Sequence, residues 1–204
     1  GFTPPWAGSP QGPLVQPGTY SAQLYLYHQG RLKAQGIPQR FEVKPVPNLS
    51  QGSEPEQVSA IQRQTSELYR QISVSDKLMG EASERIRYLR AALTETAAAT
   101  PELFAQLDTL STQLAALRRT LNGDRARAQL NESSTPSISG RVGMVIYGHW
   151  STRQNPTATQ RQNIEIADEA MKQFKADLAQ YLSELAAYEQ KLDDAGAPWT
   201  RGRR

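Results

Sequence analysis

The sequence predicts a mainly α-helical fold, in which an antiparallel up-down-up-down helical bundle with two long helices follows a small β-hairpin unit. Three observations predict this fold. Between residues 53 and 94, apolar or small residues recur at alternating steps of three and four, a period that is typical of a long helix packed against other helices. A second seam of this kind runs from 164 to 192. Residues 20–27 alternate with a period of two, which indicates a β-strand.

The length of 204 residues is that of one large domain, or of one domain with a small additional unit. Changes in pattern along the chain predict three parts. Residues 1–48 form a partial β-sandwich unit, residues 49–200 form a four-helix bundle, and residues 201–204 form a disordered tail.

The first part reads as two strands after an irregular lead-in that is rich in proline and glycine. The first strand begins at Thr19, residues 28–30 turn the chain, and the second strand runs to Lys44 with an irregular join at Pro38. Two or three strands are too few for an independent sheet. We therefore expect the end of a β-sandwich whose strands touch the helices and whose other strands lie upstream.

The first long helix begins at a capping box in residues 53–56, where the Ser53 hydroxyl and the Glu56 carboxylate each accept from a backbone amide of the first turn. Its predicted seam has eleven positions, three of which are threonine, serine and alanine. These positions are Val58, Ile61, Thr65, Leu68, Ile72, Ser75, Met79, Ala82, Ile86, Leu89 and Leu93.

A second helix begins at Thr100-Pro101 and ends at Asn122-Gly123, because proline suits the first helical position and glycine the position after the last. Its connection to the first helix is short, so the two helices are expected to pack antiparallel. Its apolar seam is a row of leucines, namely Leu103, Leu107, Leu110, Leu114, Leu117 and Leu121.

Residues 124–135 are polar and predict an extended or partly helical connection, and a short helix follows from Thr135-Pro136. The last helix begins at a second capping box in residues 157–160 and ends at Gly196 and Pro198. We expect it to run antiparallel to the first helix. Its seam consists of Ile164, Ala167, Met171, Phe174, Leu178, Tyr181, Leu185, Tyr188 and Leu192.

The net charge of +3 does not indicate a nucleic-acid-binding surface. Residues 1–48 carry four basic side chains and one acidic one, and the last four residues carry three arginines. The helical part, 49–200, holds 16 basic and 19 acidic side chains, so that no basic groove is expected along it. No apolar run approaches the roughly 18 residues that a membrane-spanning helix requires.

Few residues suggest catalysis or cofactor binding. The chain has no cysteine and two histidines, and it lacks metal-binding pairs, an acidic calcium loop and a glycine-rich phosphate loop. We therefore expect this chain not to be an enzyme, and we assign no catalytic, cofactor-binding or metal-binding residue to it. Arg118, Arg119, Arg125 and Arg127 cluster around the end of the second helix, where solvated capping is favoured over anion binding.

Four aromatic or histidine side chains form the candidate ligand surface, namely Tyr25, Tyr27, His149 and Trp150. Tyr25 and Tyr27 lie on one face of the first strand and could stack against a sugar, although two tyrosines in this pattern more often serve packing. Trp150 and Trp199 are instead expected to plug the ends of the bundle.

Several short segments resemble parts of a known protein family. Residues 12–20 and 41–45, GPLVQPGTY and FEVKP, resemble the end of the sandwich domain in large bacterial sortilin-like propeller proteins. The segments at 138–141, 156–160 and 195–200, ISGR, PTATQ and AGAPWT, are similar to the helical C-terminal region of the same proteins. These proteins contain BNR repeats and are often labelled glycosyl hydrolases.

The resemblance implies that a β-propeller and a fibronectin-like sandwich precede this chain in a larger, exported bacterial protein. It implies a non-catalytic structural or interaction module, with an extracytoplasmic location, whose partners are those upstream domains. It carries no catalytic residue over, because the label belongs to the propeller. Two other functions are considered: a carbohydrate-binding or glycosidase-associated fragment, and a helical bundle that associates with itself or with a protein partner.

Overall fold

A computed structural model describes residues 15–45, 53–150 and 152–200 of the chain. The predicted tail at 201–204 and the first residues of the predicted sandwich unit lie outside the described residues. The chain divides into two compact units, of which the first comprises Gly1–Arg63 and Tyr147–Thr157 and the second Gln64–Ile146 and Ala158–Arg204. The fold is a helical bundle after a β-hairpin, as the sequence predicts.

The hairpin consists of β1 (Gly18–His28) and β2 (Arg31–Val43), which pair antiparallel. Gln29 and Gly30 connect them with φ angles of 48° and 76°, the backbone of a tight two-residue turn that favours glycine. The predicted irregularity is confirmed, because Ala22 pairs with Gln39 and Leu24 with Gln35. The residues at 36–38, including Pro38, therefore bulge out opposite a single β1 residue.

The first long helix, α1, extends over Pro55–Thr94. It begins at Pro55, so Glu54 and not Ser53 precedes the first helical residue, because proline suits the first turn of a helix. The Glu54 amide donates to Asn155 Oδ1 over 2.7 Å, which satisfies a group that the helix itself cannot pair. All eleven positions of the predicted seam are buried.

The second helix, α2 (Pro101–Asn122), has the predicted bounds. Gly123 follows it with φ of 86° and donates its amide to the Arg119 carbonyl over 2.8 Å, so that this glycine ends the helix. Four of the six predicted leucines are buried, and Leu103 and Leu117 are half-buried. The polar connection after α2 contains a short helix, α3 (Arg125–Gln129), whose first amides donate to the Asp124 carboxylate.

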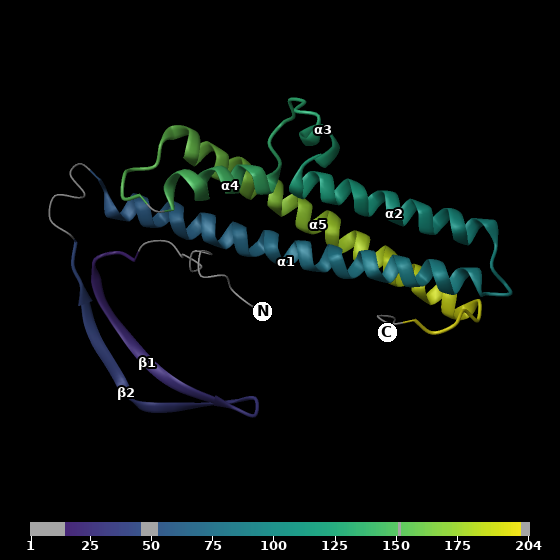
Figure 1. The fold of residues 1–204 in the computed structure, drawn as a ribbon, viewed down its shortest axis with the longest axis horizontal. Helices are drawn as coiled ribbons and strands as arrows, with labels where there is room; N and C mark the ends of the chain where they lie inside the picture. Colours follow the sequence, from purple (N-terminus) through teal and green to yellow (C-terminus); the bar gives the residue numbers. More distant parts are fainter. Residues whose placement is uncertain (1–14, 46–52, 151, 201–204) are drawn as a thin grey trace. The chain divides into compact units, whose positions relative to one another are not determined.

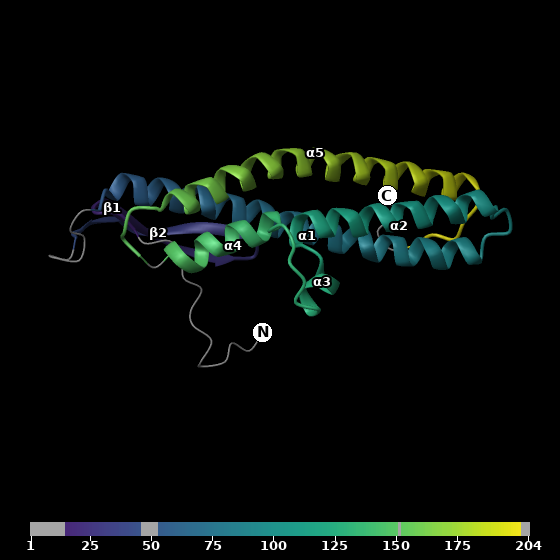
Figure 2. The same ribbon diagram turned by 90° about the horizontal axis from the view of Figure 1, so that it is seen from above.

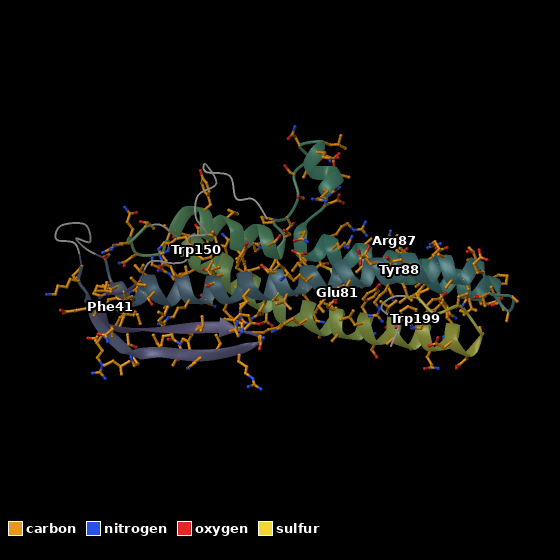
Figure 3. The ribbon with its side chains drawn as sticks, turned by 60° about the horizontal axis from the view of Figure 1, so that its bottom comes forward. Phe41, Glu81, Arg87, Tyr88, Trp150 and Trp199 are labelled. Carbon is orange, nitrogen blue, oxygen red and sulfur yellow. The ribbon has the colours of Figure 1, made fainter. Side chains whose placement is uncertain are left out.

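Two further helices complete the bundle. The short α4 (Ile138–His149) is followed by a loop and then by the long α5 (Ala158–Asp194). All nine residues of the predicted α5 seam are buried, and Gly196, with φ of 73°, ends the helix. Trp199, on the segment after α5, is 74% exposed and is labelled in Figure 3. The prediction that Trp199 plugs the bundle is therefore wrong.

The second unit holds the main helical core. In Figures 1 and 2, α2 and α5 lie beside the part of α1 that belongs to this unit. Contacts between α1 and α2 occur in opposite order along the two helices, as antiparallel packing requires. Arg90 pairs with Asp108 at 2.6 Å, and Arg118 donates to the Met79 carbonyl at 3.1 Å.

The last helix differs in direction from the prediction, since α5 runs parallel to α1. Arg85 of α1 donates to both carboxylate oxygens of Glu189, at 2.7 and 2.6 Å, and each residue lies in the last third of its helix. The cause is α4, which continues in the direction of α2 instead of reversing it (Figure 1). The chain therefore reverses only after α4, and α5 returns in the direction of α1 (Figure 1).

Candidate interaction site on the hairpin

The hairpin carries apolar side chains on both of its faces. Residues that pair directly across two strands share a face, so the register assigns each side chain to one of two sets. One face holds Leu24, Leu26 and Phe41, and the other holds Tyr25, Tyr27 and Leu32, and each of these six is more than half exposed. Leu24 is 71% exposed and Leu32 is 70% exposed, although both are residues that usually lie in a core.

No residue from Gly18 to Val43 is buried. The one ring contact on the hairpin is a stack of Tyr20 against Phe41, with ring centroids 6.0 Å apart. Near the turn, where Leu24, Tyr27 and Leu32 lie, neither face is covered. The hairpin therefore has two long paired strands and a well-formed turn but no core of its own.

Tyr25 and Tyr27 lie two residues apart on β1 and point to the same face. Their exposed fractions are 53% and 69%, and Leu32 pairs with Tyr27 across the hairpin. These three side chains thus form an exposed apolar strip with two phenol rings. Such a strip could cover an apolar protein surface or stack against a sugar ring.

His149 is buried and is not part of this exposed strip. It is only 2% exposed, and its Nε2 lies 2.9 Å from the Gln154 carbonyl oxygen. The Gln62 amide of α1 donates to the His149 carbonyl over 3.2 Å and to the Thr152 carbonyl over 3.4 Å. His149 and Gln62 thus hold the loop after α4 against the start of α1.

Trp150, which is labelled in Figure 3, follows His149 and is half-buried. The structure therefore separates the four predicted ligand residues into two groups. Tyr25 and Tyr27 form an exposed pair on the hairpin, whereas His149 and Trp150 belong to the packed end of α4.

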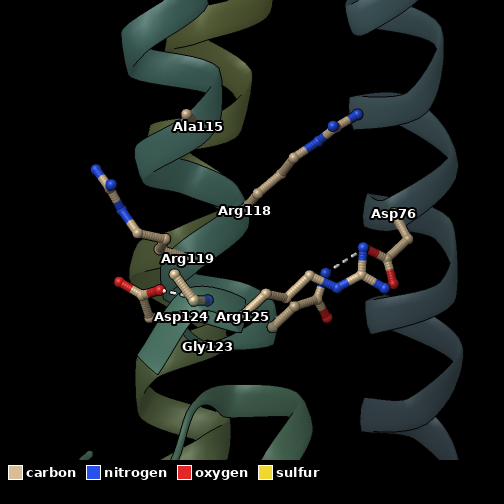
Figure 4. Close-up of a pocket in the computed structure, with 9 residues that line it drawn as sticks. Asp76, Ala115, Arg118, Arg119, Gly123, Asp124 and Arg125 are labelled. Carbon is tan, nitrogen blue, oxygen red and sulfur yellow. Dashed lines mark hydrogen bonds between the residues drawn. The ribbon is translucent and has the colours of Figure 1, made fainter. Parts of the chain in front are cut away.

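Three of the four arginines line a recess of about 720 Å³, together with Asp76 of α1 and Asp124. These three are Arg118 and Arg119, in the last turns of α2, and Arg125, which follows it. Figure 4 shows Arg118 extending toward α1 and Arg119 extending to the opposite side. The two acids already have partners, because Asp76 accepts from Asn122 at 2.7 Å and Asp124 caps α3. The arginines do not converge on one point, which favours solvated capping over an anion site.

The part of the chain that the structure describes holds neither a metal-binding cluster nor a membrane-spanning helix. No group of three or more histidine, cysteine, aspartate or glutamate side chains in it could hold a metal ion. None of its helices is both long and apolar enough to cross a membrane.

Sequence reasoning missed most of the exposed apolar surface, namely Leu24, Leu26, Leu32, Ile37 and Phe41. The signal was present, because residues 24–27 are all apolar or aromatic and so break the alternation of a half-buried strand. Apolar residues at consecutive positions of a strand are typical of a strand that is covered on both faces.

Comparisons with protein-family models, with curated proteins and with solved structures found no match for this chain.

Proposed function

We propose that this chain is a non-catalytic interaction module whose hairpin docks onto another β-structured domain of a larger, exported propeller protein. The neighbouring domain supplies the cover that the hairpin lacks. The resemblance of residues 12–20 and 138–141 to sortilin-like propeller proteins suggests which domain this is, a fibronectin-like sandwich upstream.

One observation carries the proposal: a hairpin of two long strands has no buried residue and exposes large apolar side chains on both faces. An isolated two-stranded hairpin is marginally stable in water, and three or more strands or a packed face are needed. Exposed apolar patches of this kind mark protein contacts. Covering Leu24, Tyr27 and Leu32 would stabilise the hairpin by about 1.5–3 kcal/mol for each side chain.

Hydroxyl-radical footprinting tests the proposal by comparing the isolated 204-residue chain with the native species purified from source cells. We expect Leu24, Tyr27 and Leu32 to be labelled readily in the isolated chain and to be protected several-fold in the native species. Tyr147 of α4, which is 94% exposed, serves as the internal control, because its labelling reports the radical dose. Equal labelling of the hairpin in both samples would overturn the proposal.

A second candidate function, carbohydrate binding, has one observation in its favour: the two exposed rings of Tyr25 and Tyr27 on one face. Calorimetric titration of the chain with a panel of glycans tests it. Saturable binding that Tyr27→Ala abolishes and Tyr147→Ala leaves unchanged would establish this function. No heat of binding across the panel would exclude it for the glycans tested.

Self-association is the remaining candidate function, and the burial of each leucine decides which variant can test it. Leu185 is fully buried within a single chain, so a charge at this position would unfold the bundle and would not report on a dimer. Light scattering of the chain and of Leu24→Asp is the better test, since Leu24 is exposed on the hairpin. A dimer that this variant dissociates would favour self-association.

A further inference from the structure

The two strands of the hairpin differ in the features that govern whether a strand edge can pair with another strand. Residues 19–27 of β1 contain no lysine, arginine, aspartate, glutamate or proline. In contrast, β2 contains Pro38, a bulge at 36–38 and four charged residues. These charged residues are Arg31, Lys33, Arg40 and Glu42.

This difference has a physical consequence. The outer edge of a sheet exposes unpaired amides and carbonyls, and proteins prevent unwanted pairing at such edges with charged side chains, proline and bulges. Pro38 has no amide to donate, and the bulge interrupts the regular spacing of donors and acceptors along β2. The β2 edge thus carries three protective features, and the β1 edge carries none of them.

From this asymmetry we infer that the outer edge of β1 adds to the edge strand of a neighbouring β-sheet, while β2 remains the terminal strand. The inference rests on the proposed function, because it names which edge of the same hairpin meets the neighbouring domain. Strand addition provides main-chain hydrogen bonds, and side chains on both faces then provide specificity.

The register identifies the backbone groups that would form these bonds. In a hairpin with a two-residue turn, the flanking pair is hydrogen-bonded, here His28 with Arg31, and the pairs alternate from there. Tyr27 and Leu32 therefore form a non-hydrogen-bonded pair, and so do Tyr25 and Ala34. The amides of Tyr25 and Tyr27 point outward from β1, and those of Leu32 and Ala34 point outward from β2.

The side chains define the chemistry of the partner. Near the turn, β1 presents Leu24 and Leu26 on one face and Tyr25 and Tyr27 on the other. A strand that is apolar on both faces fits a sheet that is covered on both sides, as parallel sheets and the inner strands of packed sheets are. The partner is therefore an uncharged edge strand of a sheet with apolar residues above and below it.

Hydrogen–deuterium exchange at single-residue resolution tests the inference, again by comparing the isolated chain with the native species. We expect the amides of Tyr25 and Tyr27 to exchange at least about tenfold more slowly in the native species, because they become paired. The outward amides of Leu32 and Ala34 should exchange equally fast in both. Equal slowing on both strands, or slowing on β2 alone, would overturn the inference.

Variants of the native protein provide a second test, with size-exclusion chromatography in the presence of mild denaturant as the measure of hairpin docking. Tyr25→Pro removes an outward amide from β1 and should release the hairpin at a lower denaturant concentration. Tyr25→Thr removes the ring but keeps the amide, and Ala34→Pro removes the matching amide from β2. If Ala34→Pro weakens docking as much as Tyr25→Pro does, the inference is wrong.

The failure of this inference can be distinguished from the failure of the proposed function. If footprinting shows the side chains of Leu24 and Tyr27 protected while the amides of Tyr25 and Tyr27 exchange freely, the hairpin docks through its faces and only the edge assignment fails. If neither the side chains nor the amides are protected in the native species, the proposed function fails with it.

Discussion

Leu89 and Arg87 lie two residues apart on α1 in opposite environments, because Leu89 is fully buried and Arg87 is exposed with its guanidinium 4.7 Å from the Tyr88 ring centre. We expect Leu89→Ala to lower the free energy of unfolding by about 2–5 kcal/mol, since it leaves a cavity in the core. Arg87→Ala should cost less than about 1 kcal/mol. Chemical denaturation of both variants measures the difference, and equal, small effects would contradict the assigned helix register.

The Arg85–Glu189 pair is the most buried ion pair between described residues, with side-chain exposures of 23% and 8%. Arg85→Ala leaves the Glu189 carboxylate without the guanidinium that faces it, so we expect a loss of about 3 kcal/mol in unfolding free energy. Replacing both residues together, by methionine and leucine, should recover most of this loss. As a control, Lys172→Ala, which breaks an exposed pair with Asp168, should cost under about 1 kcal/mol.

Burial raises the pKa of Tyr181 to about 12 and that of Tyr188 to about 12. Unfolded tyrosine has a pKa of about 10, so between these values the unfolded state loses protons that the folded state keeps. Stability from both phenols is therefore complete below about pH 10 and is lost as the pH rises toward 12. Denaturation at a series of alkaline pH values should show this decline, and Tyr181→Phe combined with Tyr188→Phe should flatten it. A decline that Tyr147→Phe flattens equally would contradict this assignment.

The individual helices could be predicted well from the sequence, because their seams and their ends are local features. All seam positions of α1 and α5 are buried as predicted, and Gly123 and Gly196 end their helices. The direction of α5 could not be predicted, because it depends on whether the connection at 124–137 reverses the chain. The periodicity of apolar residues within a helix does not show whether the connection after it reverses the chain. In the structure, α4 continues in the direction of α2 (Figure 1).

Two glycines of the bundle have opposite roles at the level of the helix. Gly80 lies inside α1, and a Cβ added there would contact nothing within 4 Å, whereas Gly123 has a φ of 86°. Gly80→Ala should therefore stabilise the protein by about 0.5–1 kcal/mol, and Gly123→Ala should destabilise it by about 1 kcal/mol. Thermal unfolding of the two variants tests the signs. A destabilising Gly80→Ala would mean that the interior of α1 is less regular than described.

At the scale of the whole molecule, the hairpin and the bundle differ in whether their apolar side chains are covered. The bundle buries its apolar seams within the chain, whereas the hairpin exposes Leu24, Tyr27 and Leu32 to solvent. Alternation along β1 could predict a strand but not what covers it, because the proposed cover lies outside this chain. The candidate site was therefore recognised in the sequence only through its two tyrosines, and its aliphatic residues became evident with the structure.

This chain is proposed to act as part of a larger protein, and the size and compartment of the native species test that claim most directly. An antibody against the bundle, applied to fractionated source cells, should detect a species several times larger than the 22.6 kDa of this chain, outside the cytoplasm. A species of about 22.6 kDa would contradict the claim and would leave association with a separate partner, or with a second copy, as the role of the hairpin.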